Sequence, residues 1–436
     1  MIKIGAGEVN ATPVLGKEIP GYFNVRNASG VLSDLYAKAI VIDDGKTVAA
    51  IAALDSLGGS FEMVKRARKL ASEKTGIPEE NILVHFTHSH TAAPVDLDLY
   101  GTKADAECTE FSCMKIADAI SIAFEKREEA LVGSARGYED GISFNRRFYM
   151  KNGTVKMNPP FASPDIVKNE GPKDTAVEVL RIDSAETGKP LAVITNFSCH
   201  LDCVGGKEYC GDYPSEMAKV IKRELGDSVV SLFLNGCCGD INHFDFTKPK
   251  YIKTGHWRKM GRILAYDVLS AREKADAGEV EGFEASYKYM KIDRRDVTVD
   301  ELSWAKKTLA DANTTHMDAT YANDIIGLCD KVREPHNIPM QCIKIGDTAI
   351  VSVPGEVFTQ IGLDIKSISP FEHTMTVELG NGNIGYVASE LAHKNRLEAP
   401  SFEMTTTAYE TRISSYVDAV PETAGLFVDT ARSLLG

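Results

Sequence analysis

The chain has 436 residues, of which 43% are hydrophobic and 25% are charged, a composition typical of a globular protein with one large core or two modest ones. Its formal net charge of −13 argues against a nucleic-acid binder, which needs a basic face, and against docking on anionic membranes. No apolar run is long enough for a transmembrane helix and residues 1–8 contain no apolar signal core, so we expect a cytoplasmic protein without stable membrane insertion.

The first part of the chain alternates apolar strands with helices. Residues 37–42 and 47–54 predict a hairpin about the turn at Asp43–Gly45, and Ser60 predicts the start of a helix that runs to about residue 73. Further strands are expected over 82–86, 130–138, 177–182, 191–197 and 229–234, and further helices over 104–128, from about Pro214, and over 256–274.

The segment 151–173 is rich in Pro, Asn and Lys and is expected to form a long loop over the surface or the site. Beyond residue 274 the pattern predicts a strand over 280–294, two helices over 299–312 and 316–332 as a peripheral insertion (299–332), a hairpin over 340–353, a helix after Glu356, a strand over 374–379 and a last helix near 421–434. We therefore expect an α/β (α+β mixed) fold in which mixed β-sheets are flanked by helices, as a single catalytic domain over residues 1–436.

Ligand-capable residues follow four of the apolar strands. They are His88 and His90 after 82–86, Cys199 and His200 after 191–197, residues 235–243 after 229–234, and Glu356 after 349–353. Sites of α/β proteins gather at the carboxyl ends of strands, so these residues are expected to share one site. Two histidines at i and i+2 can converge where a strand ends, and neutral imidazole is a good zinc ligand. The alternative is a pair of loop histidines bonded to main-chain carbonyls.

The nine cysteines are an odd number, which fits free thiols in a reducing compartment. Five of them lie near the expected site in sequence, and none forms a Cys-x-x-Cys knuckle: Cys199, Cys203, Cys210, Cys237 and Cys238. Either they are small packing residues, or they provide a thiolate ligand or a redox-sensitive rim.

A series of short motifs in the same order resembles the catalytic domain of the neutral (non-lysosomal) ceramidases, zinc-dependent amidases that cleave N-acylsphingosines. These motifs are residues 5–13 with Gly21-Tyr22, 87–91, 144–147, the strand that ends in His200, 235–242, 354–356 with Phe358-Thr359, and Gly385-Tyr386 with Tyr409-Glu410. The resemblance implies zinc held by His88, His200, Glu356 and Tyr386. It also implies that His90 bonds the substrate or an intermediate and that Arg146 faces the polar end of the substrate.

Two imidazoles and a carboxylate leave an open position for water, as in catalytic zinc sites. Such a zinc lowers the pKa of water from about 15.7 to about 7 and can polarise a substrate carbonyl. His90 or Asp240 could then shuttle the proton, and His90 and Asn242 could stabilise the oxyanion.

Four of these residues also have a plainer interpretation. Glu356 at a helix start would favour the helix dipole, and Tyr386 could be a packing aromatic. Asp240 after Gly239 could form an Asx-turn or a cap, and Arg146 could pair with a surface carboxylate.

The chain departs from the family pattern in three places. Asn242 stands where the family has a serine with a catalytic role, and Thr91-Ala92-Ala93-Pro94 replaces Ser-Gly-Pro. The chain also ends soon after Tyr409-Glu410, so no C-terminal immunoglobulin-like domain is expected.

These residues leave three interpretations of function. The first is a zinc-dependent hydrolase that uses metal-activated water on the amide (C–N) bond of a small soluble N-acyl compound, with an ester or lactone as lesser alternatives. The second is a true ceramidase acting on N-acylsphingosine, which would need a long apolar groove. The third is a non-catalytic metal- or ligand-binding protein on the same scaffold. Nothing in the sequence specifies an oligomeric state.

Overall fold

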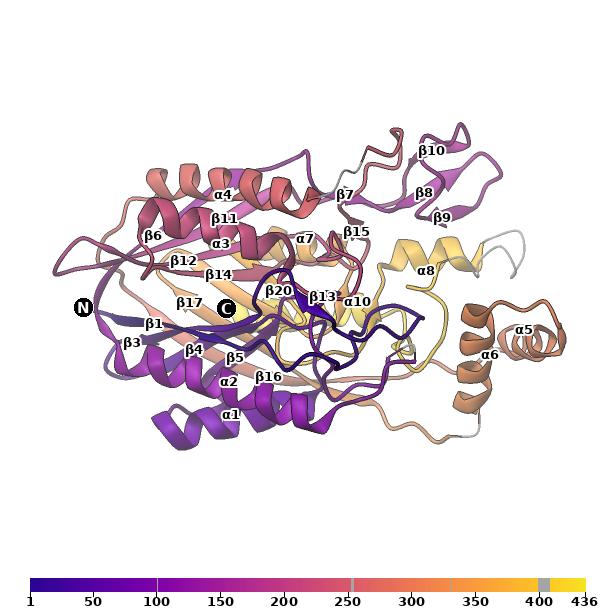
Figure 1. Ribbon diagram of the computed structural model, residues 1–436, viewed down its shortest axis with the longest axis horizontal. Coiled ribbons are helices and arrows are strands. Elements are labelled where there is room, and N and C mark those ends of the chain that lie inside the picture. The colour runs from indigo at the N-terminus through magenta and orange to yellow at the C-terminus, as the bar shows by residue number, and fades with distance from the viewer. Residues whose placement is uncertain (100, 252–254, 330, 399–407) are drawn as a thin grey trace.

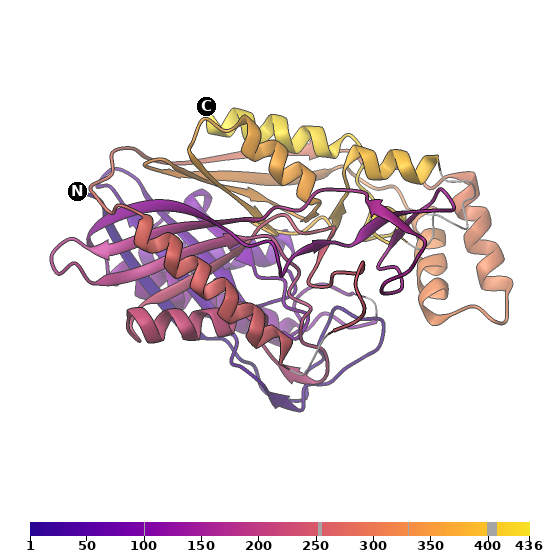
Figure 2. The ribbon, with the colours of Figure 1, turned by 90° about the horizontal axis from the view of Figure 1, so that it is seen from above.

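Two β-sheets form the centre of the molecule (Figures 1 and 2). The computed structural model describes residues 1–99, 101–251, 255–329, 331–398 and 408–436. The larger sheet contains β1 (Lys3–Asn10), β3 (Tyr36–Asp43), β4 (Val48–Leu54), β5 (Ile82–Phe86), β6 (Glu128–Tyr138), β11 (Ala176–Ser184), β12 (Pro190–Phe197) and β14 (Val230–Asn235). The smaller contains β16 (Phe283–Ile292), β17 (His336–Ile345), β18 (Thr348–Val353) and β20 (His373–Glu378).

The strand order is β14-β12-β11-β6-β1-β3-β4-β5 in the larger sheet and β16-β17-β18-β20 in the smaller. Most neighbours are antiparallel, but three pairs are parallel: β4 with β5, β12 with β14, and β18 with β20. In each parallel pair both carboxyl ends point the same way, which is the arrangement that gathers polar side chains at one edge.

The alternation of side chains along the strands builds the layers. In β3, Ile40 and Ile42 face the smaller sheet, whereas Ala39 and Val41 pack under helices, because successive side chains of a strand point to opposite faces. Helices α1 (Phe61–Thr75), α2 (Ala106–Glu125), α3 (Asp212–Leu225) and α4 (His256–Lys274) cover the outer face of the larger sheet, and α7 (Thr359–Ile368) and α10 (Thr423–Leu435) cover that of the smaller. The expected mixed sheets flanked by helices are thus confirmed, in four layers (Figure 2).

The expectation of a long loop over 151–173 is wrong in part. β9 (Val155–Met157) and β10 (Ile166–Asn169) lie on either side of β8 (Arg147–Met150) in a small antiparallel sheet at the upper right of Figure 1. The turn between β8 and β9 contains Asn152-Gly153, with φ of 81° at the glycine, and Asn-Gly is a strong hairpin signal. Phe246 packs against both Phe148 and Phe161, which gives this sheet its own small core.

Shorter elements and the helices near the site complete the described fold. They are β2 (Gly30–Val31), β7 (Phe144–Asn145), β13 (Glu208–Tyr209), β15 (Ile241–Asn242), β19 (Glu356–Val357), β21 (Tyr386–Val387), the 3-10 turn Glu79–Asn81, α5 (Val299–Ala310), α6 (His316–Cys329) and α8 (Glu390–Leu397). α5 and α6 lie at the right-hand end of the molecule in Figure 1, away from the two termini. Among the described residues, no helix combines the length and the apolar character that a membrane crossing requires.

The two edge strands of the larger sheet come together at their carboxyl ends. The main-chain N–H of Asn235, at the end of β14, donates to Nε2 of His85 in β5 at 3.0 Å. The Nδ1 atom of His85 lies 2.8 Å from the carbonyl oxygen of Glu378 at the end of β20. Because β5, β14 and β20 meet here, the turns that follow them converge on one point.

Candidate metal centre

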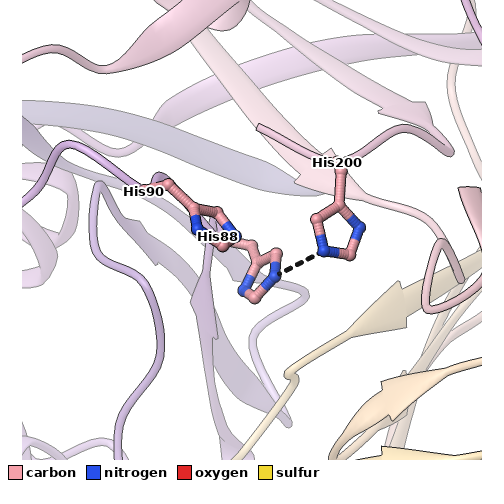
Figure 3. A group of neighbouring side chains, drawn as sticks. All are labelled: His88, His90 and His200. Atoms are coloured by element: carbon pink, nitrogen blue, oxygen red, sulfur yellow. Dashed lines mark hydrogen bonds between the residues drawn. The ribbon is translucent and has the colours of Figure 1, made fainter. Parts of the chain in front are cut away.

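His88 lies just beyond β5 in a left-handed backbone conformation, with φ of 74°, which residues other than glycine rarely adopt. The main-chain N–H groups of His88 and Ser89 both donate to the carbonyl of Ser56, at 2.8 and 3.1 Å. This turn directs the rings of His88 and His90 to the same side, with their centroids 4.9 Å apart (Figure 3). The local strain is thus located at the residue that would bind a metal.

The Nε2 atoms of His88 and His200 and one oxygen of Glu356 form a triangle. The two nitrogens lie 3.1 Å apart, and Oε2 of Glu356 lies 3.4 Å from His88 and 3.7 Å from His200. Zinc binds nitrogen and oxygen ligands at about 2.0–2.2 Å in tetrahedral geometry, which separates the ligand atoms by about 3.4 Å. The spacing of the three atoms therefore fits one such ion.

The hydrogen bonds behind the rings fix which nitrogens have lone pairs. Nδ1 of His88 lies 2.7 Å from the carbonyl of Leu57, and Nδ1 of His200 lies 3.0 Å from the carbonyl of Cys238. A carbonyl only accepts hydrogen bonds, so each Nδ1 donates, and in the neutral form of each ring Nε2 points a lone pair at the other ring. Oε2 of Glu356 is buried with no hydrogen-bond partner among the described residues. With both rings neutral, two lone pairs and a carboxylate oxygen meet at one point, which is the donor set of a divalent cation.

Glu356 is held by a tyrosine that the sequence analysis missed. The hydroxyl of Tyr416 donates to Oε1 of Glu356 at 2.6 Å and accepts from Nδ2 of Asn383 at 2.7 Å, so Oε2 is turned towards the histidines. The plainer interpretation of Glu356 as a helix-start residue is wrong, because it lies in β19 and α7 begins only at Thr359. No local pattern marks Tyr416, because only the fold brings it to Glu356.

Tyr386 is the register partner of Glu356 in the parallel pair of β19 and β21. Its hydroxyl accepts from Nη2 of Arg146 at 3.3 Å, and its ring is 6% exposed. The implied ligand Tyr386 thus lies beside Glu356, at the same cavity as the histidines.

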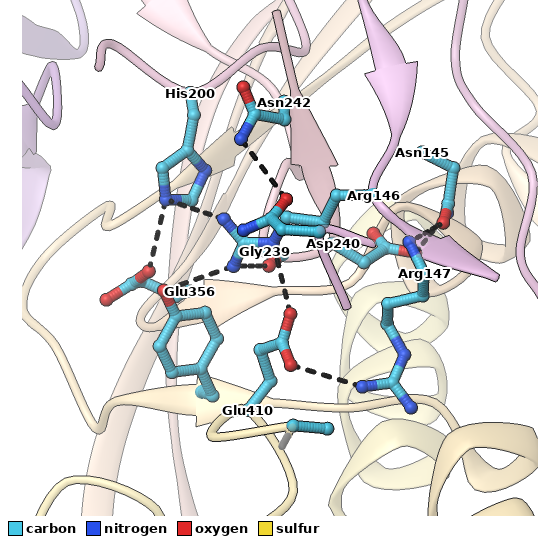
Figure 4. A network of polar contacts seen from close by, with 12 residues as sticks. Asn145, Arg146, Arg147, His200, Gly239, Asp240, Asn242, Glu356 and Glu410 are labelled. Carbon is cyan, nitrogen blue, oxygen red and sulfur yellow. Dashed lines mark hydrogen bonds and ion pairs between the residues drawn. The ribbon is translucent and has the colours of Figure 1, made fainter. Parts of the chain in front are cut away.

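Arg146 belongs to a buried ion-pair network (Figure 4). Its Nε lies 3.0 Å from Oε1 of Glu410, whose other oxygen lies 3.1 Å from Nη1 of Arg147. Its Nη2 donates to the carbonyl of Gly239 at 2.6 Å, and its Nη1 lies 3.5 Å from Nε2 of His200. The partner of Arg146 is therefore a buried carboxylate and not a surface one, although the guanidinium still borders the cavity.

Asp240 and Asn242 are separated by the fold. Asp240 accepts from the main-chain N–H of Thr359 at 2.8 Å and from Nδ2 of Asn145 at 2.7 Å, so its carboxylate caps α7 and anchors β7. Burial raises its pKa. Asn242 borders the cavity, with its Nδ2 3.5 Å from Oδ1 of Asn158. The structure brings Asn242 to the histidines and does not bring Asp240 there.

A cavity of about 230 Å³ opens onto the triangle. Apart from Asp240, the residues predicted as metal ligands or catalytic groups all border it: His88, His90, Arg146, His200, Asn242, Glu356 and Tyr386. Aromatic side chains make up much of the remaining wall, including Tyr22 and Phe23 from the N-terminal loop and Tyr321 from α6. Asp202, two residues after His200, adds a carboxylate that the sequence analysis did not consider.

His90 places a third imidazole at the same point. Potential ligand atoms of His88, His90 and His200 all lie within 4.8 Å of one another. Both ring nitrogens of His90 are buried and have no hydrogen-bond partner among the described residues. Burial lowers the pKa of His90 to about 4, so the ring is neutral at pH 7 and can either accept or donate a hydrogen bond.

The pKa values of the three residues of the triangle depend on burial and on the charges of neighbouring groups. Burial alone would lower the pKa of His88, but the Glu356 carboxylate raises it above the ordinary value. Burial opposes ionisation of Glu356, yet His88 lowers its pKa to about 2. Burial, together with Arg146, lowers the pKa of His200 well below its usual range. The carboxylate is thus ionised and His200 neutral at pH 7, the forms that bind metal.

Four of the five cysteines near the site behave as packing residues. Cys199, Cys210, Cys237 and Cys238 are buried, and burial raises the pKa of each thiol, in Cys210 to about 12. The Sγ atom of Cys238 lies 3.6 Å from Nδ1 of His200, on the side of the ring away from the triangle. A protonated thiol there supports the ring and supplies no thiolate ligand.

Comparison with known proteins places this arrangement on a recognised fold. Two similar solved structures are a ceramidase complexed with C2, at a TM-score of 0.73 and 15% identity over 99% of this chain and 75% of that one, and the neutral ceramidase from Pseudomonas aeruginosa, at a TM-score of 0.73 and 16% identity over 99% and 74%. The sequence matches no protein-family model and no curated protein. The chain therefore has the fold of the neutral ceramidases, as its motifs implied.

Proposed function

We propose that this protein is a zinc-dependent hydrolase that cleaves the amide bond of a small N-acyl compound. The observation that carries the proposal is the triangle of His88, His200 and Glu356, with ligand atoms 3.1–3.7 Å apart at a cavity of about 230 Å³. The fold shared with hydrolases of the ceramidase kind supports the same chemistry.

His88, His200 and Glu356 would hold the ion, with Tyr386 beside them as the implied further ligand. When bound, zinc polarises a carbonyl and lowers the pKa of water. The overall reaction adds water across the C–N bond, with the hydroxyl going to the acyl carbon and a proton to the amine nitrogen. Neutral His90 can take or give that proton at a ring nitrogen, and the Asn242 amide can donate a hydrogen bond to the carbonyl oxygen as its charge grows.

The volume of the cavity favours a small substrate. Pockets for drug-sized ligands measure about 300–1,000 Å³, so about 230 Å³ would leave most of the hydrocarbon of an N-acylsphingosine outside. A true ceramidase is the second candidate, supported by the likeness to a ceramidase complexed with C2. All nine cysteines are free thiols, which supports a reducing compartment such as the cytoplasm as the place of action.

The test joins metal content to activity. Zinc per chain is measured by elemental mass spectrometry in the parent protein, in His88→Ala and Glu356→Gln, and in His316→Ala, which replaces an exposed histidine on α6 as a control. We expect about one zinc per chain in the parent and the control, and loss of both zinc and amide hydrolysis in the two site variants.

Amine release from short N-acetyl amines is compared with release from N-acylsphingosine. Faster turnover of the short amides supports the proposal, and faster turnover of N-acylsphingosine selects the ceramidase. A protein that stays metal-free after reconstitution with zinc would remove the metal from the mechanism and favour a ligand-binding protein.

A further inference from the structure

Asp202 gives the cavity a carboxylate that no described cation pairs with. It lies two residues after His200 and is partly exposed at the cavity wall. The hydroxyl of Tyr22 donates to Oδ1, and Oδ2 has no hydrogen-bond partner among the described residues. A carboxylate oxygen left open at a cavity is an acceptor for a ligand donor, and a charged donor makes the strongest such bond.

The other charged side chains of the cavity wall either form an ion pair or belong to the metal-ligand triangle. Arg146 is paired with Glu410 at 3.0 Å, and Glu356 faces His88 and His200. Of the described charged groups that border the cavity, Asp202 is the one that neither forms a direct ion pair nor faces the metal-ligand triangle.

Arg26 lies near Asp202 and attracts it electrostatically, but the two side chains form no direct ion pair. Its guanidinium stacks over the ring of Tyr22, 4.1 Å from the centroid. It donates to the carbonyls of Pro20 and His90, both at 2.8 Å, and of Gly206 at 3.1 Å. The side chain of Arg26 is buried among these three carbonyl groups. Its nitrogens lie more than 4 Å from the carboxylate oxygens of Asp202. The guanidinium therefore fixes the position of Tyr22 and leaves the carboxylate of Asp202 open.

The loop around Asp202 is held on both sides. The main-chain N–H of His90 donates to the carbonyl of Leu201 at 3.1 Å. The carboxylate of Asp212 accepts from the N–H groups of Cys203 at 2.9 Å and Val204 at 3.2 Å. Burial and the charge of Asp202 raise the pKa of Tyr22, so its hydroxyl remains a donor. Asp202 is therefore pre-organised at a fixed place beside His90, which lowers the cost of binding a ligand there.

The wall around Asp202 is aromatic. Tyr22, Phe23 and Tyr321 border the cavity, and the rings of Phe23 and Tyr321 lie 5.7 Å apart. Aromatic faces attract organic cations and also cover a short apolar chain. The cavity thus presents the metal-ligand triangle at one point and a carboxylate with aromatic neighbours at another.

We propose that the substrate is a short N-acyl compound with a protonated amine at its far end, and that Asp202 binds this ammonium group. The amide would lie at the triangle and a short apolar spacer along the aromatic wall. This proposal rests on the proposed function for the placement of the amide, whereas the cation site itself can be tested by binding alone.

The test compares N-acetyl-1,4-diaminobutane with N-acetylpentylamine, which has a methyl group in place of the ammonium. Dissociation constants are measured by calorimetry, and amine release is followed separately. The proteins are the zinc-loaded parent, Asp202→Asn, Tyr22→Phe, and Asp429→Asn as a control for an exposed aspartate on α10. We expect the parent and the control to bind the cation about 10- to 100-fold more tightly than its isostere, and Asp202→Asn to lose this preference with unchanged zinc content.

Tyr22→Phe keeps the carboxylate, so it should keep the preference for the cation over its isostere. If Asp202→Asn does not fold, the comparison of the two probes in the parent and in Tyr22→Phe still tests the proposal. Equal binding of the two probes by the parent, no binding of either, or a preference that survives in Asp202→Asn or is lost in Tyr22→Phe would overturn the proposal. Preferential binding without any amide cleavage would support the cation site while rejecting the hydrolase. Cleavage of N-acetylpentylamine without a preference for the cation would support the hydrolase and reject the cation site.

Discussion

The Nε2 atoms of His88 and His200 lie 3.1 Å apart, and both rings use their Nδ1 atoms on main-chain carbonyls. Two acceptor nitrogens at this distance repel each other unless a cation lies between or beside them. With an ionised carboxylate at 3.4 and 3.7 Å, the cluster is complete only when it binds a positive charge. The stability of the protein should therefore depend on metal.

Removal of the metal should destabilise the protein. A ligand that binds only the folded state adds about 2.7 kcal/mol when its concentration is about 100 times its Kd. We expect a chelator to lower the melting temperature, and added zinc to restore it, in the parent and not in His88→Ala. A melting temperature that changes with neither chelator nor zinc would contradict the assignment of the triangle as a metal site.

Replacement of Tyr416 by Phe should weaken metal binding without abolishing it. The variant loses the 2.6 Å hydrogen bond that holds Oε1 of Glu356, and loss of such a partner typically costs about 10- to 100-fold in metal affinity. Competition against a chromophoric chelator measures the affinity. The control is Tyr289→Phe, at an exposed tyrosine of β16, which should match the parent. Equal affinities in all three proteins would show that Tyr416 does not position the carboxylate.

Glu410→Gln should be strongly destabilising. Glu410 is fully buried between Arg146 and Arg147, at 3.0 and 3.1 Å. Its neutralisation leaves the buried guanidinium of Arg146 without a carboxylate, whereas Arg147 keeps its ion pair with Glu170. Breaking a buried pair in this way costs about 3–5 kcal/mol. Urea denaturation measures the change in the free energy of unfolding. Glu73→Gln, which removes an exposed carboxylate of α1, should cost about 0–1 kcal/mol; similar losses in the two variants would refute the importance of the network.

Asn242 is expected to contribute to catalysis through its amide. Loss of one donor to a developing oxyanion costs about 100- to 1,000-fold in kcat. The kcat of Asn242→Ala should therefore fall by about that factor, with unchanged zinc content. Asn242→Ser restores a hydroxyl donor and should retain more activity than Asn242→Ala. Amine release measures both, beside Asn313→Ala as an exposed control. Full activity in Asn242→Ala would exclude this role.

Asp212 should make the stability fall as pH rises. Burial raises its pKa to about 7, against about 3.9 in an unfolded chain. Between these values the folded state keeps a proton that the unfolded state releases, so the free energy of unfolding falls with increasing pH.

Asp212→Asn removes this proton, and Asn tolerates the left-handed conformation found here, with φ of 54°. The stability of the parent minus that of the variant should fall between pH 5 and 7, by at most about 1.4 kcal/mol per pH unit. Urea denaturation at several pH values gives this difference. A difference that is constant or rises with pH would contradict the shifted pKa.

Much of the local structure could be predicted from the sequence. The apolar runs at 82–86, 191–197 and 229–234 are strands, and Ser60 caps α1 by accepting from the N–H of Met63. These features depend on side-chain period and on capping within a few residues, which the order of amino acids displays directly. Asn152-Gly153 is an equally clear local hairpin signal, whereas the composition of the same segment by itself favours a loop.

The order of His88, His200 and Glu356 along the chain, each after an apolar strand, was also a property of the sequence, and it predicted that they share a site. Only the tertiary structure brings the three side chains together in space. β5 and β14 are the two edges of one sheet, and they touch only because the sheet curls until Asn235 reaches His85. The contacts of Tyr416 with Glu356, and the placement of Asp202 without a paired cation, arise from the same packing. Such contacts join residues far apart in the chain, and no local period or turn encodes them, because they depend on how whole sheets and loops pack.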